Sequence, residues 1–179
     1  MALYMAYSTD DVYISEFFPT ENFVLSQFLY TGQYTGYNKC PDAYRSLLKF
    51  DITDILSSKI TIKNAFLHLY VTRKDKINYV DNTYRSLRVY SNLVNFSENT
   101  ATWNNAPNIS ITEHNKIISG KDIGTYIQLN ITCLFMKWCN RTIANNGITL
   151  LGTENVIDTL IGYDSSRSPN PPYLSIEYW

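Results

Sequence analysis

The sequence predicts an all-β protein, a β-sandwich or barrel of antiparallel strands with one short helix. Aromatic residues make up 15% of the 179 residues, with 15 Tyr against 8 Phe, and charged residues only 17%. Tyr and Thr suit pleated, half-buried positions. Short segments of alternating residues also recur along the chain between clusters of Asn, Asp, Gly and Pro, which is typical of sheets. Without a repeat or a linker, we expect a single domain over residues 1–179.

The strands can be justified in order. Leu3, Met5 and Tyr7 alternate with Tyr4 and Ala6, which predicts a first strand over Ala2–Tyr7 and a turn over Ser8–Asp11. The opening residues lack the basic and apolar regions of a secretory signal. The other expected strands are Gln27–Tyr34, Arg45–Asp51, Ala65–Thr72, Ser86–Tyr90, Thr125–Ile131, Ile148–Leu151, Leu160–Tyr163 and Tyr173–Tyr178.

One segment follows a helical period instead. In NITCLFMKWCN the apolar residues Ile131, Leu134, Phe135 and Trp138 fall at i, i+3, i+4 and i+7, the spacing of a buried helical stripe. This predicts a short helix near Thr132–Cys139, capped by Thr132 or Asn130. We expect Trp138 and Trp103 to lie in the core.

Composition and motifs exclude several functions. The net charge of −1 offers no basic field for nucleic acid, and no apolar run is long enough for membrane insertion. His68 and His114 belong to no nucleophile motif, and no phosphate loop, HExxH or CxxC occurs, so we expect neither an enzyme nor a cofactor. Asp10 and Asp11 could meet Asp158 or Asp164 around calcium. Solvated loop carboxylates are the simpler interpretation, and no metal ligands are assigned.

The cysteines have two interpretations. Cys40, Cys133 and Cys139 are an odd number, so one of them has no partner within the chain. On the expected helix Cys133 faces away from the apolar stripe and Cys139 lies at its edge, so these two are badly placed to bridge each other. They are either free thiols in a reducing cell, or Cys40 and Cys133 form cross-links between chains.

The order of the segments resembles a known family. The segments that follow the order of this family span nearly the full length of the chain. They are DVYI (residues 11–14), YRSLLKFD (44–51), AFLHLYV (65–71), TWNNAP (102–107), the helix with Trp138, NGITL (146–150) and PPYLSI (171–176). The chain resembles the DNRLRE domain, a jelly-roll-like module also classed among carbohydrate-binding modules. The resemblance implies a β-sandwich of jelly-roll type and a non-catalytic module of surface proteins and polysaccharide-active enzymes.

The stretch YTGQYTGY (residues 30–37) has two interpretations. The resemblance places Gln27–Tyr34 in a strand, which accounts for most of the stretch without a ligand. Tyr34 and Tyr37 could still be exposed, and sugar C–H faces stack on aromatic rings. These two residues are therefore the candidate ligand-binding residues.

Two functions from different classes remain. The first is a structural subunit of a bacterial cell-surface or spore-surface layer or fibre, whose partners are copies of itself joined through strand edges and through Cys40 and Cys133. The self-association strand would comprise Ala2, Leu3, Tyr4, Met5, Ala6 and Tyr7, which is apolar and terminal. The alternative is a carbohydrate-binding module that recognises a polysaccharide through exposed tyrosines. The structural subunit is the favoured hypothesis at this stage.

Overall fold

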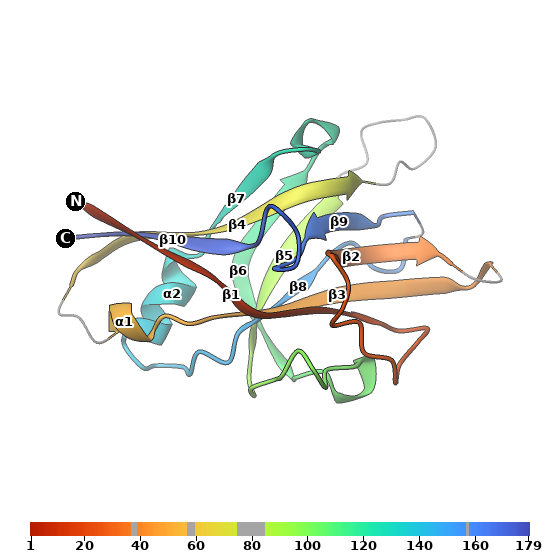
Figure 1. Cartoon of the computed structure of the whole chain (residues 1–179), viewed down its shortest axis with the longest axis horizontal. Coiled ribbons are helices and arrows are strands. Elements are labelled where there is room, and N and C mark those ends of the chain that lie inside the picture. The colour runs from red at the N-terminus through yellow and green to blue at the C-terminus, as the bar shows by residue number, and fades with distance from the viewer. Residues whose placement is uncertain (37–38, 57–59, 75–84, 157) are drawn as a thin grey trace.

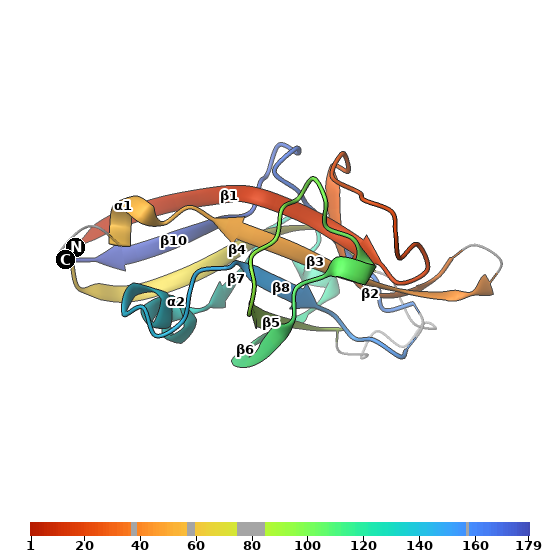
Figure 2. The same cartoon turned by 90° about the horizontal axis from the view of Figure 1, so that it is seen from below.

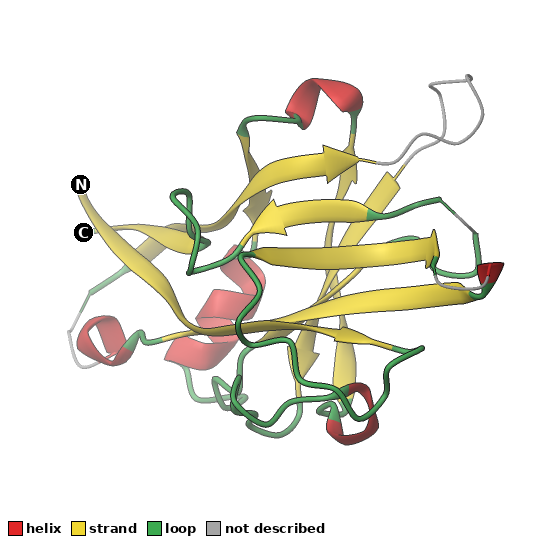
Figure 3. Ribbon diagram, turned by 45° about the vertical axis from the view of Figure 1, so that its right-hand side comes forward, coloured by secondary structure: helices red, strands yellow, loops and turns green. Residues whose placement is uncertain are grey.

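The computed structural model describes residues 1–36, 39–56, 60–74, 85–156 and 158–179 (Figure 1). The strands are β1 (Ala2–Ser15), β2 (Phe28–Thr35), β3 (Pro41–Phe50), β4 (Ile62–Lys74), β5 (Arg85–Asn92), β6 (Ile109–Ile118), β7 (Tyr126–Asn130), β8 (Ile148–Leu151), β9 (Ile161–Asp164) and β10 (Tyr173–Tyr178). The α-helices are α1 (Thr53–Leu56) and α2 (Thr132–Cys139), and single 3-10 turns lie at Trp103–Asn105 and Gly120–Asp122. Strands thus dominate the described chain, as Figure 3 shows, and the all-β prediction is confirmed.

Two antiparallel sheets are joined through shared strands. In the first sheet, β10 and β7 flank β4, and Ala2–Tyr7 of β1 pairs with β10. In the second sheet, Ser8–Ser15 of β1 pairs with β3, followed by β8, β5 and β6. A second connection between the two sheets runs through β9, which pairs with β2 and with the end of β4. β1 therefore crosses from one sheet to the other, and Figures 1 and 2 show it running along the molecule.

The core lies between the sheets. Leu67 and Leu69 of β4 meet Leu48 of β3 and Leu150 of β8, and each is fully buried. Phe135 and Trp138 of α2 close this core, with their ring centroids 6.0 Å apart. α2 lies near the end of the molecule that holds both chain termini (Figures 1 and 2). The predicted helix and the burial of Trp138 are confirmed.

The start of α2 uses side chains from two elements. Ile131 occupies the N-cap position, and the Asn130 Oδ1 accepts a hydrogen bond from the Thr132 N–H at 3.0 Å. The Leu134 N–H donates to Nε2 of His114 at 3.3 Å. His114 falls in none of the strands expected from the sequence, but it lies on β6 and is 8% exposed. The strand β6 was missed because its apolar side chains Ile111 and Ile117 face solvent, which inverts the usual pattern.

Two further predictions were wrong. The expected turn at Ser8–Asp11 is continuous strand with a register shift between Ser8 and Asp10, so the polar residues there mark a bulge and a change of sheet. Trp103, expected in the core, is half-buried. The ring packs against the small cluster of Val12, Ile14, Leu47 and Ala101, and the Arg45 guanidinium lies 4.7 Å from the ring centre in a cation–π contact.

No helix among the described residues is long and apolar enough to cross a membrane.

Candidate functional site

Tyrosine side chains gather on the outer face of the first sheet. Because side chains alternate along a strand, one set of residues on β1, β10, β4 and β7 faces away from the core. The strand register places Tyr7 opposite Tyr173, Tyr173 opposite His68, and Tyr70 opposite Tyr126. We call the surface formed by Tyr7, His68, Tyr70, Tyr126 and Tyr173 the tyrosine face.

The rings of the tyrosine face form one contiguous row. The Tyr173 ring centroid lies 5.7 Å from that of Tyr7 and 5.3 Å from that of Tyr126, which is in turn 5.3 Å from Tyr70. The Tyr7 and Tyr173 planes are tilted by 48°, and the other two pairs meet at 71° and 75°, the edge-on geometry that aromatic pairs favour. Tyr7 is 53% exposed and Tyr126 is 36% exposed. The row therefore presents aromatic surface to solvent across several strands.

His68 supports this row from below the solvent surface. Its imidazole stacks on Tyr173 with centroids 4.2 Å apart and planes 7° apart, and it is 5% exposed. Its Nε2 lies 2.8 Å from the Ser175 hydroxyl oxygen. Burial lowers the pKa of His68, so the ring is neutral at pH 7. The contact with Ser175 holds the imidazole ring in place. Among the described residues no carboxylate hydrogen-bonds to His68, so His68 and Ser175 do not form a Ser-His-Asp triad there.

Polar groups continue the same face along the strands. Gln128 lies opposite His68, and Asn130 lies opposite Phe66. The Asn64 Nδ2 donates to Glu177 Oε2 at 2.6 Å. The aromatic row is thus bordered by amide, hydroxyl and carboxylate groups. Such a surface suits an extended ligand that offers both C–H faces and hydroxyl groups.

The comparison with known families matches this chemistry. Residues 4–178 match the profile of carbohydrate-binding module family 96. The chain belongs to this family. No curated protein matches it. Family 96 membership supports the carbohydrate-binding part of the resemblance drawn from TWNNAP and RSLLKFD. Modules of this kind are typically non-catalytic, which agrees with the expectation that the chain is not an enzyme.

The two candidate residues from YTGQYTGY lie away from the tyrosine face. Tyr34 is half-buried near the end of β2, and the Arg73 guanidinium lies 5.0 Å from its ring centre. Tyr37 lies outside the described residues. Tyr34 could offer one ring to a ligand of this family 96 module, whereas the tyrosine face offers four neighbouring tyrosine rings.

A second aromatic cluster lies beside β1 and β2. Tyr13 stacks on Phe23 with centroids 4.5 Å apart and packs edge-on against Tyr30 at 5.1 Å. Burial raises the pKa of Tyr13 to about 12, and burial together with a hydrogen bond to Asp42 raises that of Tyr44. Tyr13, Tyr30 and Tyr44 are half-buried. Phe18 and Phe28, at the border of the cluster, are 43% and 39% exposed, so the cluster also reaches the surface.

The acidic residues proposed for calcium have other partners. Asp11 is 1% exposed, and its carboxylate accepts hydrogen bonds from the Ser166 backbone at 2.7 Å and from Arg167 at 2.9 Å. Arg167 also pairs with Glu98 at 2.8 Å. Asp11 therefore anchors the loop that leads to β10. No group of three His, Cys, Asp or Glu side chains in the described part of the chain could hold a metal ion.

The candidate cross-linking cysteines lie far apart. Cys40 and Cys133 are both exposed, and Cys139 is half-buried against the core. Cys40 precedes β3 at the end of the molecule opposite the termini, whereas Cys133 lies on α2 (Figures 1 and 2). A hydrogen bond to Glu113 raises the pKa of the Cys133 thiol. Cys40 and Cys133 therefore do not lie close enough to bridge each other within one chain.

Sequence reasoning missed Tyr7, Tyr70, Tyr126 and Tyr173 as a group. The shared parity of His68 and Tyr70 was visible along one strand. Their neighbours come from β1, β7 and β10, which the register alone brings together. The one signal available was the excess of Tyr itself.

Proposed function

We propose that this family 96 module binds a polysaccharide along the tyrosine face. The observation that carries the proposal is the contiguous row from Tyr7 through Tyr173 to Tyr126 on an exposed sheet face. An open, multi-strand surface suits an extended chain better than a single sugar, since successive units can contact successive strands. Ring stacking supplies apolar contact, and Ser175 and Gln128 offer hydrogen-bonding groups beside it.

The experiment measures retention of the protein on a panel of insoluble and gel-embedded polysaccharides. On any polysaccharide that retains the wild type, Tyr173→Ala and Tyr126→Ala should each weaken binding by about tenfold or more, as buried aromatic contacts do. Tyr90→Ala, a half-buried tyrosine on β5, is the matched control. Retention unchanged in both tyrosine-face variants would contradict the proposal.

The same assay tests the two residues expected from sequence. If Tyr34→Ala and Tyr37→Ala abolish retention while Tyr173→Ala does not, the ligand binds at the end of β2. Equal loss in both sets would indicate one long site that crosses β4 and β9.

A second candidate function is self-association through β1, and one observation favours it. Among the described strands, Ala2–Tyr7 pairs only with β10, so its other edge is open. Leu3, Met5 and Tyr7 face solvent, each more than 40% exposed. Uncharged strand edges of this kind accept another strand.

The test for self-association must preserve the fold. Deleting residues 2–7 would remove Ala6, which belongs to the core, and Tyr4, which packs against it, so that deletion cannot separate assembly from stability. Met5→Lys adds an outward charge at the strand edge and leaves the core intact. We expect wild-type multimers in light scattering and monomers of Met5→Lys. A wild type that remains monomeric at high concentration would contradict this candidate.

A further inference from the structure

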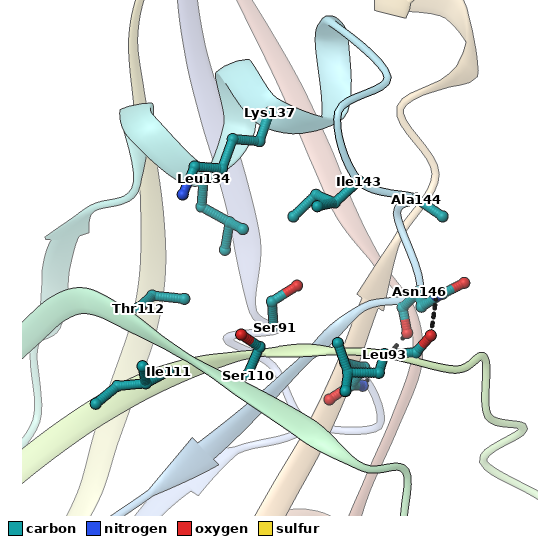
Figure 4. Close-up of a pocket in the computed structure, with 11 residues that line it drawn as sticks. Ser91, Leu93, Ser110, Ile111, Thr112, Leu134, Lys137, Ile143, Ala144 and Asn146 are labelled. Atoms are coloured by element: carbon teal, nitrogen blue, oxygen red, sulfur yellow. Dashed lines mark hydrogen bonds between the residues drawn. The ribbon is translucent and has the colours of Figure 1, made fainter.

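A cavity of about 300 Å³ opens between α2 and the β5–β6 pair. Figure 4 shows Leu134 and Lys137 of α2 on one side, Ser91 and Ser110 on the other, and Ile143 beside them. Ser91 and Ser110 are paired across the two strands. β5 and β6 belong to the second sheet, whereas the strands that carry the tyrosine face belong to the first (Figure 2), so the cavity and the tyrosine face use different sheets.

Some polar groups of the cavity wall hold each other in place. The Asn146 Nδ2 donates to the Leu93 carbonyl at 3.0 Å, and the Asn92 Nδ2 donates to the Asn146 carbonyl at 3.3 Å. The Asn92 Oδ1 accepts a hydrogen bond from the Thr149 hydroxyl at 2.6 Å. This network fixes one wall of the cavity before any ligand arrives, which lowers the ordering cost of binding.

Other polar groups are available to a ligand. The hydroxyls of Ser91 and Ser110 and the ammonium group of Lys137 have no hydrogen-bond partner within the described ranges. Ser91 is only 6% exposed, so its hydroxyl is reachable chiefly through the cavity. Leu134 and Ile143 give the same space an apolar side. Two serine hydroxyls and an apolar wall therefore line one small volume, and Lys137 lies at its edge (Figure 4).

We propose that this cavity is a second, separate binding site that takes one neutral sugar unit, such as the end or a branch of a glycan. Its volume is at the lower limit for ligand sites, which excludes a long chain. A pyranose offers hydroxyls to Ser91 and Ser110 and a C–H face to Leu134 and Ile143. The choice of a glycan rests on the proposed function, but the site itself does not use the tyrosine face.

Two sites on different sheets have a consequence for the module. One protein could hold a polysaccharide on the tyrosine face and the end of another chain in the cavity. Each wild-type molecule would then bridge two glycan chains, and the second contact would gain from the high local concentration created by the first.

The experiment titrates the intact chain with the methyl glycosides of glucose, galactose, mannose and N-acetylglucosamine, followed by ligand-observed NMR. For at least one of them we expect saturable binding that weakens tenfold or more in Ser110→Leu, which fills the cavity mouth, and in Lys137→Met. Tyr173→Ala should bind that glycoside as the wild type does. Lys121→Met, on an exposed turn, is the control, and thermal unfolding verifies the fold of each variant.

The outcomes separate this inference from the proposed function. Binding of a glycoside that is unchanged in Ser110→Leu and Lys137→Met, or no saturable binding to any of the four, overturns the second site while polysaccharide retention stands. Glycoside binding lost in those variants, without retention on any polysaccharide, overturns the proposed function and upholds the second site. With both sites present, wild-type protein should cross-link soluble polysaccharide into aggregates that Ser110→Leu does not form.

Discussion

At the scale of single residues, His114 shows how a buried polar side chain can serve a helix. Its Nε2 accepts a hydrogen bond from the Leu134 N–H, which is possible only while that nitrogen is unprotonated. Burial lowers the pKa of His114 below its usual value near 6.5. The unfolded chain therefore binds a proton at His114 more readily than the folded chain does, so stability rises with pH through this region.

We expect the free energy of unfolding to fall as the pH is lowered from 7 through about 6.5 and below, with part of the fall due to His114. His114→Gln can still accept the helix N–H but does not titrate. Denaturant unfolding at several pH values should show a smaller fall in this variant. An identical pH profile for the two proteins would contradict the role of His114. His68 has a lowered pKa for the same reason, so His68→Gln serves as a comparison.

Trp138 tests the core at one position. It is 2% exposed and packs against Phe135. Trp138→Ala should therefore lower the free energy of unfolding by about 3–5 kcal/mol, the range for truncation of a large buried side chain. Trp103→Ala should cost less because that ring is half-buried. Urea denaturation followed by circular dichroism measures both, and equal losses would contradict this distinction.

At the scale of elements, the two Thr-Gly steps of YTGQYTGY differ in their role. Gly32 has a φ of +98°, and a Cβ placed there would lie 2.4 Å from the Thr159 carbonyl oxygen. Gly36 has no heavy atom within 4 Å of the same position. The strand β2 therefore needs glycine at residue 32, where it passes close to the segment before β9, and not at residue 36.

Gly32→Ala should lower the free energy of unfolding by about 2–4 kcal/mol, because it adds both backbone strain and a clash. Gly36→Ala is the matched control and should change it by less than about 1 kcal/mol. Thermal or urea unfolding of the two variants measures the difference. Similar stability for both would show that β2 can move away from Thr159.

The burial pattern of each element explains which elements could be predicted from the sequence. The period of Ile131, Leu134, Phe135 and Trp138 predicted α2 correctly, and the alternation of β4, β8 and β10 predicted those strands, since these elements bury one regular face. β6 could not be predicted because its inward residues combine the polar His114 with Ile118, while Ile111 and Ile117 face outward. The tyrosine face could not be predicted because Tyr7 and Tyr173 meet only through the register of their strands. No local sequence pattern encodes that register.

At the scale of the whole molecule, Cys40 and Cys133 lie in regions far apart along the long axis (Figure 1). If molecules associate end to end, a disulfide can join Cys40 of one copy to Cys133 of the next. We expect oxidation to give multimers on a non-reducing gel that reductant removes. Cys40→Ser combined with Cys133→Ser should abolish these multimers and leave the unfolding temperature unchanged. Multimers that persist in this double variant would contradict the role of these two thiols.

The pairing of the first and last strands has a mechanical consequence. Ala2 is opposite Tyr178 and Tyr7 is opposite Tyr173, so both chain ends leave the molecule side by side (Figure 1). A pulling force applied between the two ends would separate β1 from β10 sequentially, breaking one residue pair at a time from the chain ends inward. The opening would end by separating Tyr7 from Tyr173 and dividing the aromatic row. If the tyrosine face binds polysaccharide as proposed, a module pulled from both ends would thus release it, whereas one tethered by a single end would carry no load across that row.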